Sequence, residues 1–258
     1  DGHVFCTPDQ ITAEVRGIVS VIRDFYTALD MFGDGKYWVS VSVRDPQTPE
    51  KYLGDTAQWD KAEDILENIA KEEKLPYKRV EGEAAFYGPK LDFMFKDALR
   101  REWQLATAQL DFVMPERFEL TYTDHDGAKH TPVMIHRAIA GSLERFLSVI
   151  IEHFAGAFPF WLAPVQVTVI PVSDKFADYA RTVCDTLTTA GIRTEVSDES
   201  ETLGKRVRNA QKQKIPYMLV VGEKEMTDGT VAIRGRDNGD EGVQSLDDFV
   251  AQCVAHNQ

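Results

Sequence analysis

Three side chains in the first half of the chain are of types that can bind a phosphorylated substrate. Lys90 follows the turn Phe86-Tyr87-Gly88-Pro89, His136 ends an apolar run, and Arg145 lies in a segment with helical spacing. Each has an ordinary explanation on its own: a solvated lysine, a hydrogen-bonded histidine, or half of a surface ion pair. The surrounding segments make a shared ligand site the better interpretation.

The first of these segments runs from Trp103 to Phe112 and reads as a strand with polar and small residues on both faces. Alternation predicts one face with Gln104, Ala106 and Ala108, and the other with Leu105, Thr107 and Gln109. This composition suits a surface that faces a ligand better than a core. Farther along, Gly141 marks a strand-to-helix junction, so that Arg145 can hold a phosphate beside the helix N-terminus.

The elements that position these residues change character near Trp161-Leu162-Ala163-Pro164. In residues 1–162, Thr7-Pro8-Asp9-Gln10 reads as a capping box, with Thr7 as N-cap, before a helix. Apolar spacing predicts further helices at 56–73 and 140–154. Strands are expected at 37–43, 90–96, 101–112, 118–123 and 130–135, and Asp126-Gly127 is expected to turn a hairpin between the last two. This half is therefore expected to be an α+β domain with an antiparallel sheet.

Residues 163–258 alternate between strands and helices. Strands are expected at 165–172, 193–196, 217–221 and 231–234, and helices at 176–190, 203–212 and 246–255. Such alternation predicts an α/β domain with a mostly parallel sheet covered on both faces. Its basic run is either a solvated helix face or a local patch for nucleic acid: Lys205, Arg206, Arg208, Lys212 and Lys214.

Composition excludes several classes of protein. With 43% hydrophobic and 28% charged residues the chain is expected to be globular, and the net charge of −13 argues against non-specific coating of nucleic acid. No apolar run approaches the roughly 18 residues of a membrane helix, so no membrane partner is expected. The three cysteines are far apart, which indicates no disulfide framework and suits a reducing cytoplasm.

The chain resembles threonyl-tRNA synthetases in four sequence motifs, in which a dot stands for any residue: YGPK, WQ..T.QLDF, PVMIHRAI.GS.ERF and FPFWLAPVQV. Gly-Ser-x-Glu-Arg before a helix resembles the third signature motif of class II aminoacyl-tRNA synthetases. Residues 1–162 then correspond to the C-terminal part of the catalytic domain, from the end of the second motif through the third. Residues 163–258 resemble the anticodon-binding domain shared by the threonine, proline, histidine and glycine enzymes, notably in Gly204-Lys205-Arg206-Val207-Arg208 and Pro216 to Glu225.

This resemblance implies a threonine–tRNA ligase. The family activates L-threonine with ATP and Mg²⁺ and transfers it to tRNA(Thr), as a homodimer in the complete enzyme. It implies one Zn²⁺ held by His3, His136 and a cysteine outside this chain. A metal that binds the amino and hydroxyl groups of threonine would exclude valine, which an apolar pocket separates poorly from threonine.

The same resemblance assigns roles to the remaining residues. It places Asp1 beside the threonine and Tyr87 and Lys90 at the substrate, with Lys90 neutralising the α-phosphate. Gln104 and Thr107 would line the adenylate pocket, Ser142 would lie in the ATP site, and Arg145 would hold the γ-phosphate. Anticodon contacts are assigned to Lys205, Glu225 and Arg234, while Ser200 is a weaker match.

The chain also departs from the family pattern. It lacks the first motif, the second-motif arginine and the zinc cysteine, and it has Leu105-Ala106 where many members have Cys-Gly. A fragment that is inactive alone is therefore expected. One alternative is a non-catalytic, synthetase-like tRNA-binding or regulatory protein. Another, a plain α/β nucleotide-binding protein, lacks the glycine-rich loop after its first strand, where Ser173-Asp174-Lys175 stands. His3 and the motif Met134-Ile135-His136-Arg137-Ala138 disfavour a synthetase specific for proline or glycine.

Overall fold

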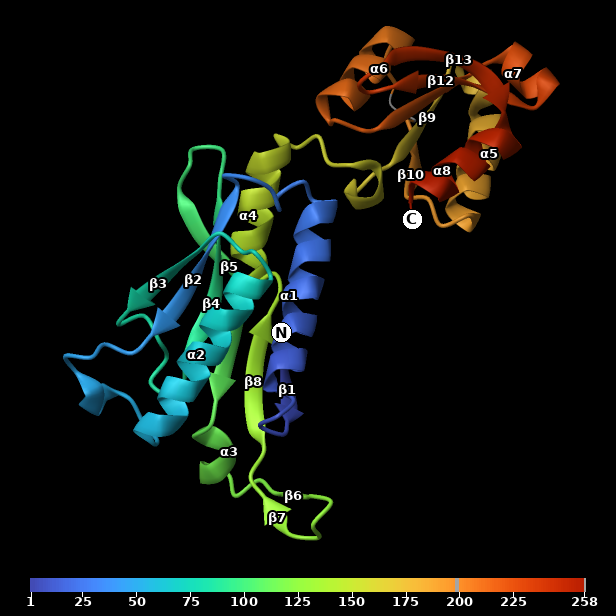
Figure 1. The fold of residues 1–258 in the computed structure, drawn as a ribbon. Helices are drawn as coiled ribbons and strands as arrows, with labels where there is room; N and C mark the ends of the chain where they lie inside the picture. Colours follow the sequence, from blue (N-terminus) through green and yellow to red (C-terminus); the bar gives the residue numbers. More distant parts are fainter. Residues whose placement is uncertain (198–199, 258) are drawn as a thin grey trace. The chain divides into compact units, whose positions relative to one another are not determined.

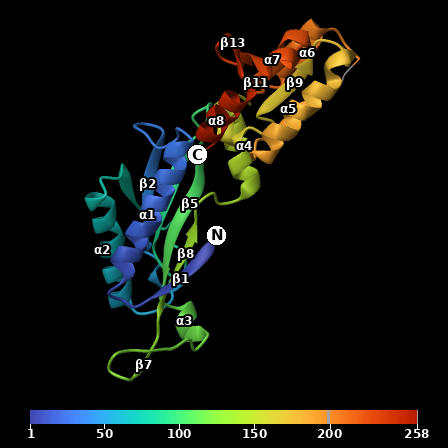
Figure 2. The same ribbon diagram turned by 90° about the vertical axis from the view of Figure 1, so that its right-hand side faces the viewer.

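The computed structural model describes residues 1–197 and 200–257, which form two compact units, Asp1–Ile150 and Ile151–Gln258 (Figures 1 and 2). Each unit has its own sheet and its own helices. Among the described residues, no helix is long and apolar enough to cross a membrane.

The first unit is built on a six-stranded sheet of order β1-β8-β5-β4-β2-β3. Every neighbouring pair is antiparallel except β2 and β3, which are parallel. The expected antiparallel sheet is thus confirmed for five strands and wrong at β3, an edge strand whose exposed charged residues hide its alternation. The strands are β1 (Gly2–Cys6), β2 (Tyr37–Val43), β3 (Tyr77–Glu81), β4 (Lys90–Lys96), β5 (Glu102–Asp111) and β8 (Val133–Ala138).

One face of this sheet is covered by α1 (Ile11–Ala28) and α2 (Thr56–Glu72), which lie side by side along it (Figures 1 and 2). The Tyr26 ring of α1 stacks on Phe95 of β4 at 3.9 Å between centroids. Helix α1 begins at Ile11, later than the capping box predicted. Gln10 does accept a hydrogen bond from the Thr7 N–H, but the Thr7 hydroxyl donates to Asp9 and caps no helical N–H.

A small hairpin extends from the sheet after α3 (Met114–Arg117). Its strands, β6 (Tyr122–Thr123) and β7 (Lys129–His130), pair antiparallel around the predicted turn at Asp126-Gly127. The strands predicted at 118–123 and 130–135 are longer than the strands β6 and β7 that the structure shows there. The continuous strand starts only at Val133 and leads through β8 into α4 (Leu143–Phe154).

The second unit has a five-stranded sheet of order β10-β9-β11-β12-β13. Its strands are β9 (Val167–Pro171), β10 (Thr194–Val196), β11 (Tyr217–Val221), β12 (Thr230–Gly235) and β13 (Gly239–Ser245). β9 is parallel to both of its neighbours, whereas β11, β12 and β13 are mutually antiparallel. The mostly parallel sheet of the prediction is therefore a mixed one. The prediction missed β13 because most of its residues are exposed and polar.

Helices cover both faces of this second sheet, as expected. On one face α5 (Ala177–Thr189) and α8 (Leu246–His256) pack Leu187 and Phe249 against apolar strand residues. On the other, α6 (Leu203–Lys212) packs Ala210 against Ile170 and Met218. A short helix, α7 (Glu223–Asp228), follows β11 and was not predicted.

Candidate active site and anticodon-binding surface

Three candidate active-site residues of the first unit, Lys90, His136 and His3, belong to a row of paired residues that crosses five strands on the face of the sheet opposite α1. Residues paired directly across neighbouring strands point to the same face. The register pairs Ser42 with Lys90, Lys90 with Gln109, Gln109 with His136, and His136 with His3. Residues as far apart as His3 and His136 thus meet on one surface.

A β-bulge in β5 brings two of the predicted residues to this same face. Phe93 pairs with Ala106 but Met94 pairs with Gln104, so Leu105 is the extra residue. The Gln104 and Thr107 side chains therefore point the same way, and the predicted placement on opposite faces is wrong. A bulge inverts the alternation locally and is common beside active sites.

Asp92 of β4 joins three of the site residues and was missed by the sequence reasoning. The Asp92 side chain is only 6% exposed. Its carboxylate accepts hydrogen bonds from the Gln104 amide at 2.7 Å and the Thr107 hydroxyl at 2.8 Å, and it pairs with the Lys90 ammonium at 3.1 Å. The signal in the sequence was a single carboxylate within the apolar run Leu91-Asp92-Phe93.

The two histidines lie against each other at the edge of the row. Their ring centroids are 4.8 Å apart and the planes are inclined by 75°. Nε2 of His136 lies 2.8 Å from Oδ2 of the fully buried Asp111, which leaves Nδ1 of His136 to bind a metal. Among the described residues, no group of three or more His, Cys, Asp or Glu is placed to hold a metal ion.

Arg145 and the junction before it are held by the bulged strand. Gly141 has a φ of +63°, and a Cβ there would lie 2.6 Å from the Leu105 carbonyl oxygen, so only glycine fits. The Arg145 guanidinium donates to the Gln104 carbonyl at 3.0 Å. Ser142 caps α4, accepting a hydrogen bond from the Arg145 N–H at 3.3 Å. Asp1 lies exposed just before β1.

Tyr87 is carried on a turn that two close contacts fix. A Cβ on Gly88 would lie 1.7 Å from the Leu110 carbonyl oxygen, and the Leu53 N–H donates to the Phe86 carbonyl at 2.8 Å. The Tyr87 hydroxyl donates to Oε1 of Gln109 at 2.6 Å. Burial and the negative charges of Asp111 and Asp92 raise the pKa of Tyr87, so this hydroxyl keeps its proton near neutral pH.

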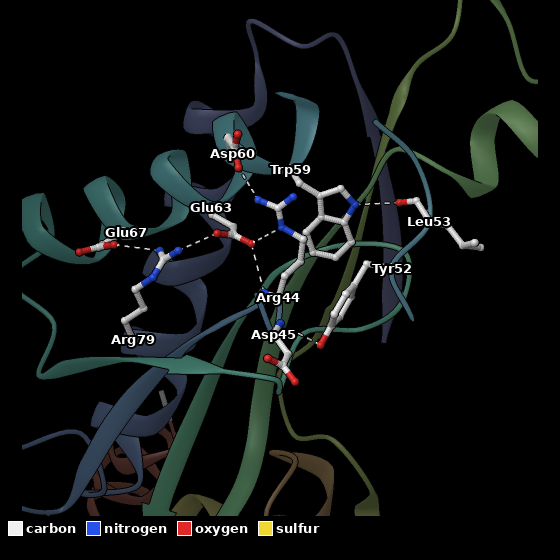
Figure 3. A network of polar contacts seen from close by, with 9 residues as sticks. All are labelled: Arg44, Asp45, Tyr52, Leu53, Trp59, Asp60, Glu63, Glu67 and Arg79. Atoms are coloured by element: carbon white, nitrogen blue, oxygen red, sulfur yellow. Dashed lines mark hydrogen bonds and ion pairs between the residues drawn. The ribbon is translucent and has the colours of Figure 1, made fainter. Parts of the chain in front are cut away.

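A polar network supports the Tyr87 turn from the side of Leu53 (Figure 3). The Trp59 indole N–H donates to the Leu53 carbonyl at 2.7 Å, and the Arg44 guanidinium lies over the Trp59 ring at 5.3 Å. Arg44 in turn donates to Glu63, which also receives a hydrogen bond from Arg79 at 2.6 Å. Glu63, 4% exposed, is the buried charge on which this network depends.

Glu63→Gln is expected to lower the free energy of unfolding of the first unit by about 2 kcal/mol. Removing one partner of a fully buried pair costs roughly 3–5 kcal/mol, and the loss is smaller here because the Arg79 side chain is 40% exposed. Thermal and urea unfolding measure the change. Glu72→Gln on the same helix is the matched control, because its exposed pair with Arg16 should contribute less than about 1 kcal/mol. Equal stability of the two variants would contradict the prediction.

One member of the basic run of the second unit, Arg206, is buried and cannot belong to a surface patch, whereas Lys205, Arg208, Lys212 and Lys214 are exposed. Arg206 is 7% exposed, and its guanidinium donates to the Pro171 and Ser197 carbonyls, so it is a structural residue. Lys205 is exposed and paired with Glu201 at 2.5 Å. The match to the family weakens over Ser197-Asp198-Glu199-Ser200-Glu201, and within this segment Asp198 and Glu199 lie outside the described residues.

The two other candidate anticodon residues lie beyond β11. Glu225 Oε2 accepts a hydrogen bond from the Gly222 N–H at 2.9 Å, which closes the first turn of α7. Arg234 is exposed on β12, beside a register shift between Ile233 and Arg234. Arg234 is therefore presented to solvent, whereas part of the Glu225 carboxylate is used within the fold.

Models of two protein families match the chain and together cover nearly all of it. Residues 1–154 match the tRNA synthetase class II core domain (G, H, P, S and T), and residues 166–256 match the anticodon binding domain. The chain therefore belongs to the class II aminoacyl-tRNA synthetases.

Curated relatives narrow this class. The chain is 48% identical over 254 residues to the threonine–tRNA ligase of Acetivibrio thermocellus, covering 98% of this chain and 39% of that protein. It is 50% identical over 250 residues to that of Thermus thermophilus, covering 97% and 37%. The chain thus spans about two fifths of the length of these relatives. The resemblance to threonyl-tRNA synthetases is confirmed, over their C-terminal region.

Solved structures agree. The RNA binding domain of threonyl-tRNA synthetase from Cryptosporidium parvum superimposes with a TM-score of 0.89 at 37% identity, covering 98% of this chain and 62% of that one. A putative threonyl-tRNA synthetase from Aeropyrum pernix gives a TM-score of 0.76 at 26% identity, with the same coverage. The fold of a class II core followed by an anticodon-binding domain is thereby confirmed.

Proposed function

We propose that this chain is the region of a threonine–tRNA ligase that completes the amino-acid and ATP site and reads the tRNA(Thr) anticodon. The observation that carries the proposal is the row of Lys90, Gln109, His136 and His3 across one sheet face. A cation, an amide and two imidazoles on one rigid surface suit a zwitterionic amino acid bound beside a nucleotide phosphate.

The roles proposed for the chain's own residues are those that the resemblance implies, and their contacts support them. Activation requires in-line attack of the threonine carboxylate on the α-phosphorus, so cations fixed beside that phosphorus stabilise the charge that develops there. Lys90, held by Asp92 with 16% of its side chain exposed, would meet the α-phosphate. Arg145 would meet the γ-phosphate, while Mg²⁺ accompanies the ATP. Gln104 and Thr107 would line the adenylate pocket beside Lys90, and Ser142 would shape its rim.

A zinc site fits the two imidazoles. The buried Asp111 carboxylate holds Nε2 of His136, which is the arrangement that fixes a metal-binding histidine in one tautomer. Bound zinc would supply a Lewis acid that distinguishes the threonine hydroxyl from the valine methyl group. His3 and His136 would hold it with the third ligand outside this chain, and Asp1 and Tyr87 would flank the amino acid.

ATP–pyrophosphate exchange by the complete protein tests this proposal. Exchange should depend on threonine and be about 10⁴-fold weaker with valine, the discrimination expected when polar groups of the site lose their substrate partner. Absence of threonine-dependent exchange would favour the second candidate, a non-catalytic tRNA-binding protein.

Arg234→Ala is expected to lower kcat/KM for aminoacylation by 10- to 100-fold, equal to about 1.4–2.7 kcal/mol, and to leave ATP–pyrophosphate exchange unchanged. A guanidinium fork suits the pairing edge of a splayed base, and Arg234 is exposed in the second unit, which carries none of the ATP-site residues. Arg181→Ala on α5, another exposed arginine of this unit, is the matched control. Equal loss of both activities in Arg234→Ala would contradict an anticodon role. Lys205 and Glu225 are proposed as weaker contacts, since each already has a partner within the fold.

Three further expectations belong to this proposal. The complete enzyme would be a homodimer, it would act in the cytoplasm, and the domains would divide at 162/163. The family models are consistent with the last point, since they leave residues 155–165 between them. Limited proteolysis of the complete protein, with cleavage concentrated in that segment, is the measurement that tests the boundary.

A further inference from the structure

We propose that Asp92 is a positioning residue of the threonine site, which acts on Tyr87 through Thr107 and Gln109 by fixing the direction of a hydrogen-bond chain. The inference rests on the proposed function and adds to it. Asp92 lies on β4, and the chain of side chains leads from it through β5 to the turn that carries Tyr87.

The carboxylate of Asp92 accepts from four donors and is almost inaccessible to solvent. Oδ1 accepts from Gln104 at 2.7 Å and from Thr107 at 2.8 Å. Oδ2 accepts from the Ser42 hydroxyl at 2.9 Å and pairs with Lys90 at 3.1 Å. Both oxygens are therefore occupied by donors from three strands, β2, β4 and β5, which fixes the carboxylate in one orientation.

This orientation sets the direction of every bond that follows. An ionised carboxylate only accepts hydrogen bonds, so the Thr107 hydroxyl must direct its proton to Asp92. The Thr107 oxygen is then an acceptor, and it receives the Gln109 amide N–H at 3.3 Å. With its nitrogen on Thr107, Gln109 presents Oε1 to Tyr87, whose hydroxyl donates to it at 2.6 Å.

The consequence falls on Tyr87. Its single proton is committed to Gln109, so its oxygen offers only lone pairs to a bound substrate. A reversed chain would turn the amide N–H₂ of Gln109 toward Tyr87 and release the phenolic proton toward the site. Asp92 thus determines whether Tyr87 accepts or donates toward a bound substrate, and it does so through Thr107 and Gln109.

Asp92→Asn is the variant that removes this control with little change of shape. The Lys90 ammonium needs an acceptor, so the asparagine oxygen should face Lys90 and Ser42. The N–H₂ then faces Thr107 and Gln104 and cannot accept from them. We expect kcat/KM for threonine-dependent ATP–pyrophosphate exchange in the complete protein to fall about 100-fold, the size of effect that slight misplacement of reacting groups produces.

A double-mutant cycle with Tyr87→Phe separates positioning from simple destabilisation. If Asp92 acts through the chain, the loss in Asp92→Asn/Tyr87→Phe is at least about fivefold smaller than the product of the two single losses. Asp97→Asn is the matched control: Asp97 is 6% exposed on the same hairpin and accepts from the Leu99 and Arg101 N–H groups and from the Trp103 indole. It should lower stability and combine with Tyr87→Phe multiplicatively.

Multiplicative losses for Asp92→Asn and Tyr87→Phe would overturn the inference. If Asp92→Asn does not fold, Thr107→Val cuts the chain while keeping the Asp92 charge, and it must show the same coupling to Tyr87→Phe. Wild-type protein without threonine-dependent exchange would instead refute the proposed function, so the two failures are distinguishable.

Discussion

Arg145→Ala is expected to reduce ATP–pyrophosphate exchange about 1000-fold, which corresponds to roughly 4 kcal/mol of transition-state stabilisation. Arg145 lies in the first turn of α4 with its guanidinium fixed on the Gln104 carbonyl at 3.0 Å. Because Gly141 allows this helix to begin against the bulge of β5, the guanidinium is held next to Gln104 before any substrate binds. Alanine would remove this fixed cation from the site.

Two control variants test whether the loss of activity comes from phosphate binding by the Arg145 guanidinium. Arg145→Lys keeps the charge but not the planar fork, so it should recover only part of the activity if the arginine binds phosphate through two hydrogen bonds. Arg16→Ala removes an exposed arginine of α1 that pairs with Glu72, and it should leave exchange unchanged. Full recovery by lysine would refute bidentate binding, and a loss below tenfold in Arg145→Ala would remove Arg145 from the catalytic machinery.

Alternation in the sequence placed Thr107 and Gln109 on one face because a strand side chain has only two directions, whereas the roles of the site residues came from the family resemblance. That His136 lies beside Gln109 follows from the pairing of β5 with β8, which the sequence did not reveal. The turn before Lys90 and the junction at Gly141 were also readable, since their glycines mark close backbone contacts.

The remaining features depend on pairing between strands, which a single sequence does not reveal. The extra residue Leu105 moves Gln104 to the face of Thr107, and nothing in WQLATAQ marks that position as a bulge. Asp92 has a function only because Thr107 lies opposite it in the register. Strands β3 and β13 lack apolar alternation because they are edge strands with exposed residues, so the parallel pairing of β3 and the antiparallel end of the second sheet were missed.

His136→Gln is expected to abolish stoichiometric zinc binding by the complete protein and to lower threonine activation at least about 1000-fold. A three-ligand protein site that loses one imidazole no longer fixes the geometry that a catalytic zinc requires. The substitution also leaves Oδ2 of the fully buried Asp111 without its imidazole partner, so some loss of stability should accompany it. Zinc content by atomic emission and exchange with threonine are the two measurements.

Asp111→Asn then separates binding of the metal from orientation of its ligand. The asparagine amide could still contact His136 but could not hold it as a carboxylate does, so zinc affinity should fall by only about 10- to 100-fold. His130→Gln on the exposed β6–β7 hairpin, where the imidazole pairs with Asp126 at 2.9 Å, is the matched control and should keep full zinc content. Retention of one zinc per chain in His136→Gln would show that the paired imidazoles do not form the metal site, whatever the activity of that variant.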